Sequence, residues 1–186
     1  MTEATRPSEP PLPVKQDVVY DGRIIRVLVE TFEAGDGTLR RREVVAHPGA
    51  VAIAARRSNG EILLVRQERL AVRRDLWEIP AGTLEPNEAP LDCAKRELRE
   101  ETGFEAENWR VVMRFFTSPG FCNEEITLFV AEGLCEVGSY DPDEISECRG
   151  CPLDRLVEMI AAGEIVDATT IVAVQALRAE TGSETP

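Results

Sequence analysis

Three glutamates near the middle of the chain have a spacing that could bind metal. Glu97 and Glu101 are four residues apart, and Glu100 lies between them. In a helix, residues three or four apart share one face, so these carboxylates would project from the same side. Like charges at this spacing repel each other, and hard carboxylate oxygens are the ligands that Mg²⁺ or Mn²⁺ prefers. Taken alone, however, such a run is more often a solvated acidic helix face.

The segment before this helix changes the balance between the two interpretations. Residues 82–90 form a loop with Gly82 and Pro90 at its ends, and the loop brings Glu85 and Glu88 near the helix. Because glycine permits close approach of the backbone, the carbonyl of Ala81 could act as a further oxygen ligand. With the loop included, the pattern favours a divalent metal site over a solvated face.

The elements that must position these residues are a mixture of strands and helices. An Asp-Gly turn and alternating runs predict a small N-terminal antiparallel β unit, and the apolar strand at 50–56 should be buried on both faces. The strands predicted after that unit are 50–56, 62–66, 109–117 and 126–132. The helices predicted are 91–102, 153–162 and 169–179. Without a regular βαβ alternation, the pattern predicts an α+β fold or a three-layer sandwich with a mixed sheet.

Length and charge limit the possible functions. The chain has 186 residues, enough for one domain with a small appendage, and its net charge of −13 argues against a broad nucleic-acid-binding surface. No apolar run approaches a membrane span, and no signal peptide is visible, so we expect a cytoplasmic protein without a membrane partner. The CxxC pair Cys148 and Cys151 lacks a second pair of zinc ligands, so we interpret it as two incidental thiols.

The stretch GTLEPNEAPLDCAKRELREETGF, residues 82–104, resembles the Nudix box at each of its fixed positions. The resemblance implies a Nudix-type α/β/α sandwich with a mixed sheet. The start of the chain is rich in Pro, Glu, Thr and Ser, so we divide the chain into a disordered tail at 1–14, the N-terminal β unit at 15–47 and a hydrolase domain at 48–180. The resemblance also implies that two or three Mg²⁺ or Mn²⁺ ions bind at Ala81, Glu97, Glu100 and Glu101. Arg96 would orient the helix carboxylates, and Glu88 would have a structural or accessory role.

Further segments resemble the ADP-ribose pyrophosphatase subfamily. Pro119 lies 16 residues after Gly103, within Ser118-Pro119-Gly120-Phe121, and the Arg41-x-Glu43 and Glu78-Ile79-Pro80 segments are also similar. The resemblance implies a homodimer whose N-terminal strands are swapped. The substrate-binding residues that it implies are Arg41, Glu43, Arg69, Glu85, Pro119, Gly120 and Glu124.

Hydrolysis also needs a group that accepts a proton from water. In the family that group lies in a mobile loop, which corresponds here to residues 139–146. Glu144 matches one of two acidic positions, while Pro142 occupies the other and cannot act. We therefore expect Glu144 to be the base, with Glu101 as the competing candidate and Glu100 as a further catalytic residue. A solvated acidic turn remains the alternative for this loop.

The resemblance implies a metal-dependent enzyme that hydrolyses ADP-ribose to AMP and ribose 5-phosphate. One alternative is the same chemistry on another nucleoside diphosphate derivative, such as GDP-mannose, FAD or a dinucleoside polyphosphate. The second alternative is a Nudix-type module that senses ADP-ribose without cleaving it. The second is disfavoured, because such modules usually lose acidic residues from the box and this chain keeps them all.

Overall fold

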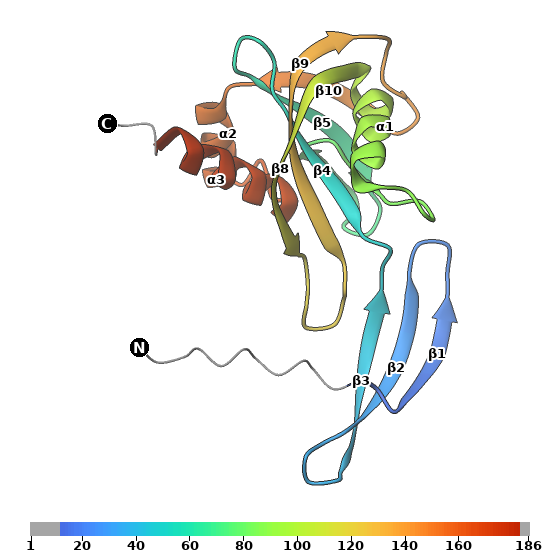
Figure 1. Ribbon diagram of the computed structural model, residues 1–186. Coiled ribbons are helices and arrows are strands. Elements are labelled where there is room, and N and C mark those ends of the chain that lie inside the picture. Colours follow the sequence, from blue (N-terminus) through green and yellow to red (C-terminus); the bar gives the residue numbers. More distant parts are fainter. Residues whose placement is uncertain (1–11, 183–186) are drawn as a thin grey trace. The chain divides into compact units, whose positions relative to one another are not determined.

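The computed structural model describes residues 12–182, which divide into two compact units (Figure 1). One unit contains the residues up to 47 together with 118–123, and the other contains residues 48–117 and those from 124 onward. Most of the tail predicted at 1–14, namely residues 1–11, lies outside the described residues. The N-terminal β unit predicted at 15–47 falls within the first of these two units.

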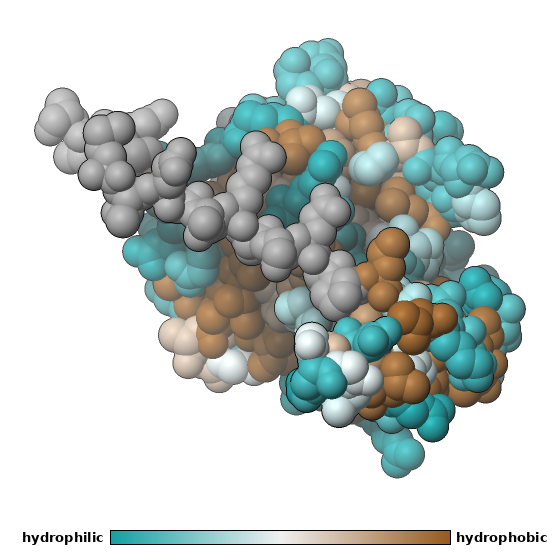
Figure 2. Space-filling view, turned by 60° about the horizontal axis from the view of Figure 1, so that its bottom comes forward, coloured by the Kyte–Doolittle hydropathy of each residue, from teal (hydrophilic) through white to brown (hydrophobic). Residues whose placement is uncertain are grey.

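The first unit is a three-stranded antiparallel sheet. Its strands are β1 (Lys15–Asp21), β2 (Arg26–Glu33) and β3 (Leu39–Ala46), in the order β1-β2-β3. The sheet buries few side chains, since Leu28 is its only buried hydrophobic residue within the described part of the chain. Figure 2 shows hydrophobic residues among hydrophilic ones on the molecular surface, and large exposed apolar residues such as Val19 and Leu39 belong to this unit.

The second unit is built around two sheets. The first has the order β7-β4-β9-β8, and the second has the order β10-β5-β6. The strands of the first sheet are β7 (Ala81–Thr83), β4 (Ala50–Ala55), β9 (Glu125–Glu136) and β8 (Phe104–Phe116). The strands of the second are β10 (Ile145–Cys151), β5 (Ile62–Arg69) and β6 (Arg74–Glu78). Because β4 pairs in parallel with β9 and antiparallel with β7, the first sheet is mixed, as predicted.

Helices cover both sides of this unit (Figure 1). The helix α1 (Pro90–Thr102) packs with Val51 and Ile53 of β4, whereas α2 (Leu153–Ala161) and α3 (Ala168–Gly182) pack in the cluster that contains Ala52 and Ala54. Successive residues of a strand point to opposite faces, so one strand contributes to both clusters. Every residue of β4 is buried, which confirms the prediction for this segment and the three-layer α/β/α arrangement.

The ends of α1 follow from local sequence. Pro90 occupies the first helical turn, and Ala89 makes no side-chain cap. Gly103 ends the helix in the left-handed conformation with φ of 74°, and its N–H donates to the carbonyl of Arg99 at 2.9 Å. A side chain at this position would also meet the backbone of Gly138, so the loop after β9 packs directly on the end of the helix.

Three strands were not predicted from the sequence. β6 and β7 are short, and β7 overlaps the start of the segment at 82–90 that we predicted to be a loop. β10 carries charged residues at Glu147 and Arg149, which hide its strand pattern. Because β10 is extended, its two cysteines point into different apolar clusters: Cys148 packs with the α1 side and Cys151 with the α2 and α3 side. Both are free thiols, consistent with incidental cysteines.

No helix within residues 12–182 is long and apolar enough to cross a membrane.

Packing of α1 makes a testable prediction about stability. Leu98 is fully buried, whereas Leu91 on the same helix is 37% exposed. We expect Leu98→Ala to lower the free energy of unfolding by about 2–5 kcal/mol, because it leaves a cavity between α1 and β4. Leu91→Ala is the matched control and should lower it by less than about 1 kcal/mol. Urea denaturation of both variants measures the difference, and equal losses would contradict this account of the packing.

Candidate functional site

The acidic residues of α1 have very different environments. Glu101 is 2% exposed and Glu97 is 9% exposed, while the side chain of Glu100 reaches solvent. The backbone N–H of Ala81 donates to Oε2 of Glu101 at 2.9 Å, which joins β7 to the helix. Burial raises the pKa of Glu101 well above its ordinary value and also raises the pKa of Glu97. The fold thus holds two carboxyl groups where their charged forms are destabilised.

Arg96 is the principal counter-charge to these residues. Its Nη1 donates to Oε1 of Glu97 at 2.6 Å and to Oε2 of Glu100 at 3.1 Å. Its Nε donates to Oε1 of Glu88 at 2.9 Å, so the loop before the helix is tied to the helix itself. The same pairing lowers the pKa of Glu88 to about 2. The other oxygen of Glu88 accepts the backbone N–H of Glu85 at 2.9 Å, which fixes the turn of the loop.

Gly82 lies directly against the carboxyl group of Glu97. A Cβ atom added at Gly82 would coincide with the side chain of Glu97, so no other residue fits without displacing it. This close approach is the reason for a glycine here, since the backbone of Gly82 is ordinary in its φ angle. The carboxyl group of Glu97 therefore sits in a cradle formed by the backbone of β7 on one side and Arg96 on the other.

Glu144 faces the same carboxyl groups from a different element. Its charge raises the pKa of both Glu97 and Glu101, after burial as the larger cause. Nε2 of Gln67, a buried side chain of β5, donates to Oε1 of Glu144 at 2.7 Å. The loop that carries Glu144 is held on α1, because the N–H of Asp141 donates to the carbonyl of Glu100 at 2.9 Å. Residues far apart in the sequence thus meet at one acidic cluster.

Arg69 lies on the same side of the unit. Its guanidinium group makes a two-point contact with Glu78, with Nε at 2.9 Å from Oε1 and Nη2 at 2.5 Å from Oε2. The side chain of Glu78 is only 6% exposed, whereas 40% of Arg69 is exposed. The pKa of Arg69 is raised first by Glu78 and to a smaller extent by Glu101. Arg69 therefore contributes positive charge to the field around Glu101.

The chemistry of these donors fits a divalent cation. The charge of Glu144 raises the pKa of both Glu97 and Glu101, and the charge of Glu97 raises that of Glu101. Hard carboxylate oxygens with excess negative charge around them are what Mg²⁺ or Mn²⁺ binds. Within residues 12–182 no three acidic, His or Cys side chains already converge as a ready cation site. Arg96 explains this, because it holds the side chains of Glu97 and Glu100. A cation would compete with Arg96 for the same oxygens.

The remaining candidate residues are distributed over the two units. Glu85 is exposed in the loop before α1, and Oε2 of Glu124 accepts the hydroxyl of Thr117 at 2.6 Å, both within the second unit. In the first unit, Arg41 and Glu43 are exposed and two residues apart on β3, so they share one face of the sheet. Pro119 and Gly120 are exposed in residues 118–123 of that unit.

Sequence reasoning assigned no role to two residues of the cluster. These are Gln67 and Glu78, and each of them holds a charged side chain in place. Only the pairing of β5 with β10 brings Gln67 to Glu144, and only the pairing of β5 with β6 places Glu78 near Arg69. No periodicity or spacing along the chain would have predicted these contacts.

Comparison with known proteins shows relatives over most of the chain. The chain is 39% identical over 168 residues to the methanol dehydrogenase activator of Bacillus methanolicus, a match that covers 89% of this chain and 91% of that protein. It is 38% identical to the ADP-ribose pyrophosphatase of Bacillus subtilis (strain 168), with the same coverage. It is 33% identical to the GDP-mannose pyrophosphatase of Yersinia enterocolitica serotype O:8 / biotype 1B, over 86% of this chain and 82% of that protein.

The chain also matches a solved structure in its fold and a family model in its sequence. A solved structure titled crystal structure of ADP compounds hydrolase superposes with a TM-score of 0.82 at 19% identity, covering 97% of this chain and 98% of that one, which supports the fold. The NUDIX domain model matches residues 46–172, more than half of the chain. The chain therefore belongs to the Nudix family, as the glutamates, arginine and glycines of residues 82–103 predicted.

Proposed function

We propose that this Nudix hydrolase cleaves ADP-ribose with water to give AMP and ribose 5-phosphate. The observation that carries the chemistry is the acidic cluster, in which the charges of Glu97 and Glu144 act on the buried Glu101, itself bound by the N–H of Ala81. The substrate is supported by the similarity to a protein named ADP-ribose pyrophosphatase at 38% identity over most of both chains. The chain keeps every acidic residue of the box, which argues against a module that only senses ADP-ribose.

Nudix enzymes typically use divalent metal ions. In this proposal Glu97, Glu100, Glu101 and the carbonyl of Ala81 hold two or three Mg²⁺ or Mn²⁺ ions. When bound, such ions neutralise the charge of a diphosphate and lower the pKa of a bound water. Arg96 keeps two of these glutamates in place with their charge balanced, and a bound cation would compete with it for their oxygens.

In our proposal Glu144 is the general base. The oxygen of water forms a bond to phosphorus, the bond from phosphorus to the bridging oxygen breaks, and the proton of water goes to Glu144. Gln67 supports this role, because it donates to one oxygen of Glu144 and leaves the other oxygen able to accept. Glu101 is the competing base, with Glu100 as a further catalytic candidate. Glu101 is less suited, since it is nearly inaccessible and is held by the N–H of Ala81.

We propose that the remaining candidate residues bind the substrate. Arg69 would hold a phosphate or ribose, and its pairing with Glu78 keeps the guanidinium group oriented. The exposed side chains of Arg41 and Glu43 on β3 would serve a homodimer in which the N-terminal strands are swapped. The other substrate-binding residues in this proposal are Glu85, Pro119, Gly120 and Glu124. The proposal includes the domain boundaries 15–47 and 48–180, a cytoplasmic location, and no nucleic-acid or membrane partner.

A second candidate substrate is a nucleotide sugar. The observation that favours it is the 33% identity to a protein named GDP-mannose pyrophosphatase. Both substrates contain a diphosphate between a nucleoside and a sugar, so the acidic cluster would act in the same way on either. The choice depends on side chains that contact the base and the terminal sugar.

Substrate choice is tested by turnover of a panel of purified compounds with Mg²⁺ present. We expect kcat/KM for ADP-ribose to exceed that for GDP-mannose, FAD and diadenosine polyphosphates by at least about tenfold, equivalent to about 1.4 kcal/mol of transition-state binding. Chromatography of the products should give AMP and ribose 5-phosphate in equal amounts. A higher kcat/KM for GDP-mannose would replace the first candidate with the second.

Removal of metal provides a second test. Chelation with EDTA should abolish turnover, and Mg²⁺ or Mn²⁺ should raise the Tm of the full-length protein, because a ligand that binds only the folded state stabilises it. Glu97→Gln should weaken metal affinity by at least about tenfold. Asp92→Asn, which changes an exposed acid on the same helix, is the control and should leave the affinity unaltered. Equal affinities in the two variants would remove Glu97 from the metal site.

The role of Glu144 is tested together with that of Gln67. Glu144→Gln should lower kcat by roughly 10²–10⁴-fold, the usual contribution of a general base, whereas Asp143→Asn in the same loop should have little effect. Gln67→Leu should lower kcat about tenfold in the native protein and cause no further loss in the Glu144→Gln background. Near-normal kcat in Glu144→Gln would exclude it as the base, and additive losses would show that Gln67 acts elsewhere.

A further inference from the structure

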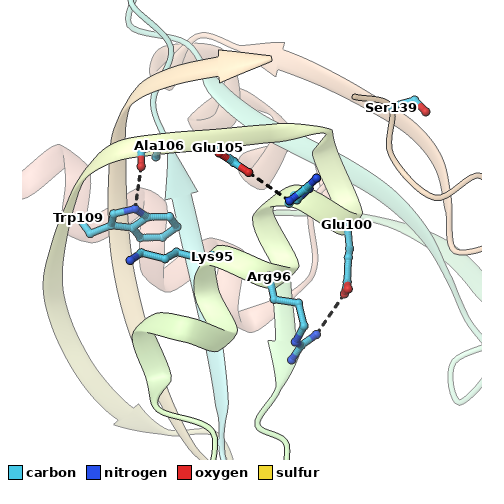
Figure 3. A pocket seen from close by; sticks show the side chains of 8 residues that line it. Lys95, Arg96, Glu100, Glu105, Ala106, Trp109 and Ser139 are labelled. Atoms are coloured by element: carbon cyan, nitrogen blue, oxygen red, sulfur yellow. Dashed lines mark hydrogen bonds and ion pairs between the residues drawn. The ribbon is translucent and has the colours of Figure 1, made fainter. Parts of the chain in front are cut away.

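A cavity lies beside the helix that carries the acidic cluster. It has a volume of about 810 Å³ and is bounded by α1, the first residues of β8 and Ser139 (Figure 3). Arg96 and Glu100, which belong to the acidic cluster, line one side of it, and the rest of the lining includes Lys95, Arg99, Glu105 and Trp109, all within the second unit. The proposed chemistry makes no use of Lys95, Arg99 or Trp109.

Of the three cations that line this cavity, Arg96 and Arg99 are paired, and Lys95 has no partner among residues 12–182. Arg96 is already shared by carboxylates at the acidic cluster. Arg99 pairs with Glu105 at 3.4 Å, but both side chains are about half exposed or more, so this pair contributes little and can be displaced. Lys95 makes no ion pair or hydrogen bond within residues 12–182. An anion placed here would gain Lys95 directly and could also recruit Arg99.

Trp109 supplies an aromatic surface to the same cavity. Its indole N–H is satisfied by the carbonyl of Ala106 at 3.1 Å, and its ring meets Phe129 edge-on with the centroids 6.0 Å apart. These contacts hold the ring in place. Because the only N–H of the indole is already hydrogen-bonded, the ring presents an apolar surface to the cavity. Figure 3 shows Lys95 beside this ring. A planar group that carries a negative charge matches both features.

The cavity is also connected to the loop that carries Glu144. Ser139, at its rim, begins this loop, and the N–H of Asp141 donates to the carbonyl of Glu100 at 2.9 Å. A ligand between α1 and Ser139 would therefore contact both the helix of the acidic cluster and the start of the loop. A ligand that binds more tightly to one arrangement of that loop than to another would change kcat, which is the requirement for regulation.

We propose that this cavity is a regulatory site for an aromatic anion of the nucleoside monophosphate class. The phosphate would be bound by Lys95 and Arg99, and the base would lie on Trp109. The choice of AMP as probe rests on the proposed function, since AMP is a product of that reaction. The site itself does not depend on that function, because AMP binding can be measured without any turnover.

The experiment is a titration of AMP against the full-length Trp77→Phe protein, in which Trp109 is the only tryptophan. We expect a saturable change in fluorescence. Lys95→Ala should weaken the binding of AMP about tenfold, while Lys15→Ala, which removes the only other lysine, should leave it unchanged. Inorganic phosphate and adenosine should each bind at least about tenfold more weakly than AMP. Equal affinity in the two lysine variants, or no change in fluorescence, would overturn the proposal.

Two further measurements separate this site from the active site. Binding of AMP should persist in Glu101→Gln, which alters the acidic cluster and leaves the cavity lining intact. In steady-state kinetics AMP should change kcat for ADP-ribose, and Lys95→Ala should abolish this effect with basal kcat unaltered. Purely competitive inhibition that survives in Lys95→Ala would place AMP at the active site only. Failure of ADP-ribose turnover would refute the proposed function without affecting the fluorescence result.

Discussion

The ion pairs of Arg96 are the interaction on which the acidic cluster depends. Glu97 and Glu101 are buried on one helix face with Glu100 next to them, an arrangement that destabilises the folded chain unless positive charge balances it. Arg96 reaches Glu88, Glu97 and Glu100 at once, so a single side chain balances the helix and anchors the preceding loop. A guanidinium group suits this task because it presents several donors in a fixed plane.

The same constraint explains why the loop and helix occur together as one motif. Gly82 leaves space for the carboxyl group of Glu97, and Ala81 donates its N–H to Glu101. These contacts require β7 to pass close to α1, and pairing of β7 with β4 keeps it there. Because β4 is buried on both faces, the strand that supports the cluster is among the least exposed parts of the molecule. A buried strand is a rigid support, so it helps to hold Glu97 and Glu101 in a fixed arrangement.

The contacts of Glu144 and Arg69 follow a common pattern. Each charged side chain is held by a neighbour from the β10-β5-β6 sheet: Gln67 holds Glu144, and Glu78 holds Arg69. One neighbour is neutral and the other is charged, so the first positions a carboxylate without neutralising it, while the second orients a guanidinium group. The helix α1 in turn has two uses. Glu97 and Glu101 present the buried part of the acidic cluster, while Arg96 and Glu100 also border the cavity with Lys95 and Trp109.

The sequence by itself determined the family, the acidic helix and the division into an N-terminal β unit and a sandwich. They could be predicted because they depend on residues close together in the sequence: the spacing of the glutamates, Gly82, Gly103 and Arg96. Pairing between distant strands decided the rest. The strands β6, β7 and β10 are too short or too charged to be recognised locally, and only their pairing places Gln67 beside Glu144 and Glu78 beside Arg69. Burial likewise appears only in the folded chain, so the raised pKa of Glu101 was a property of the tertiary structure and not of the motif.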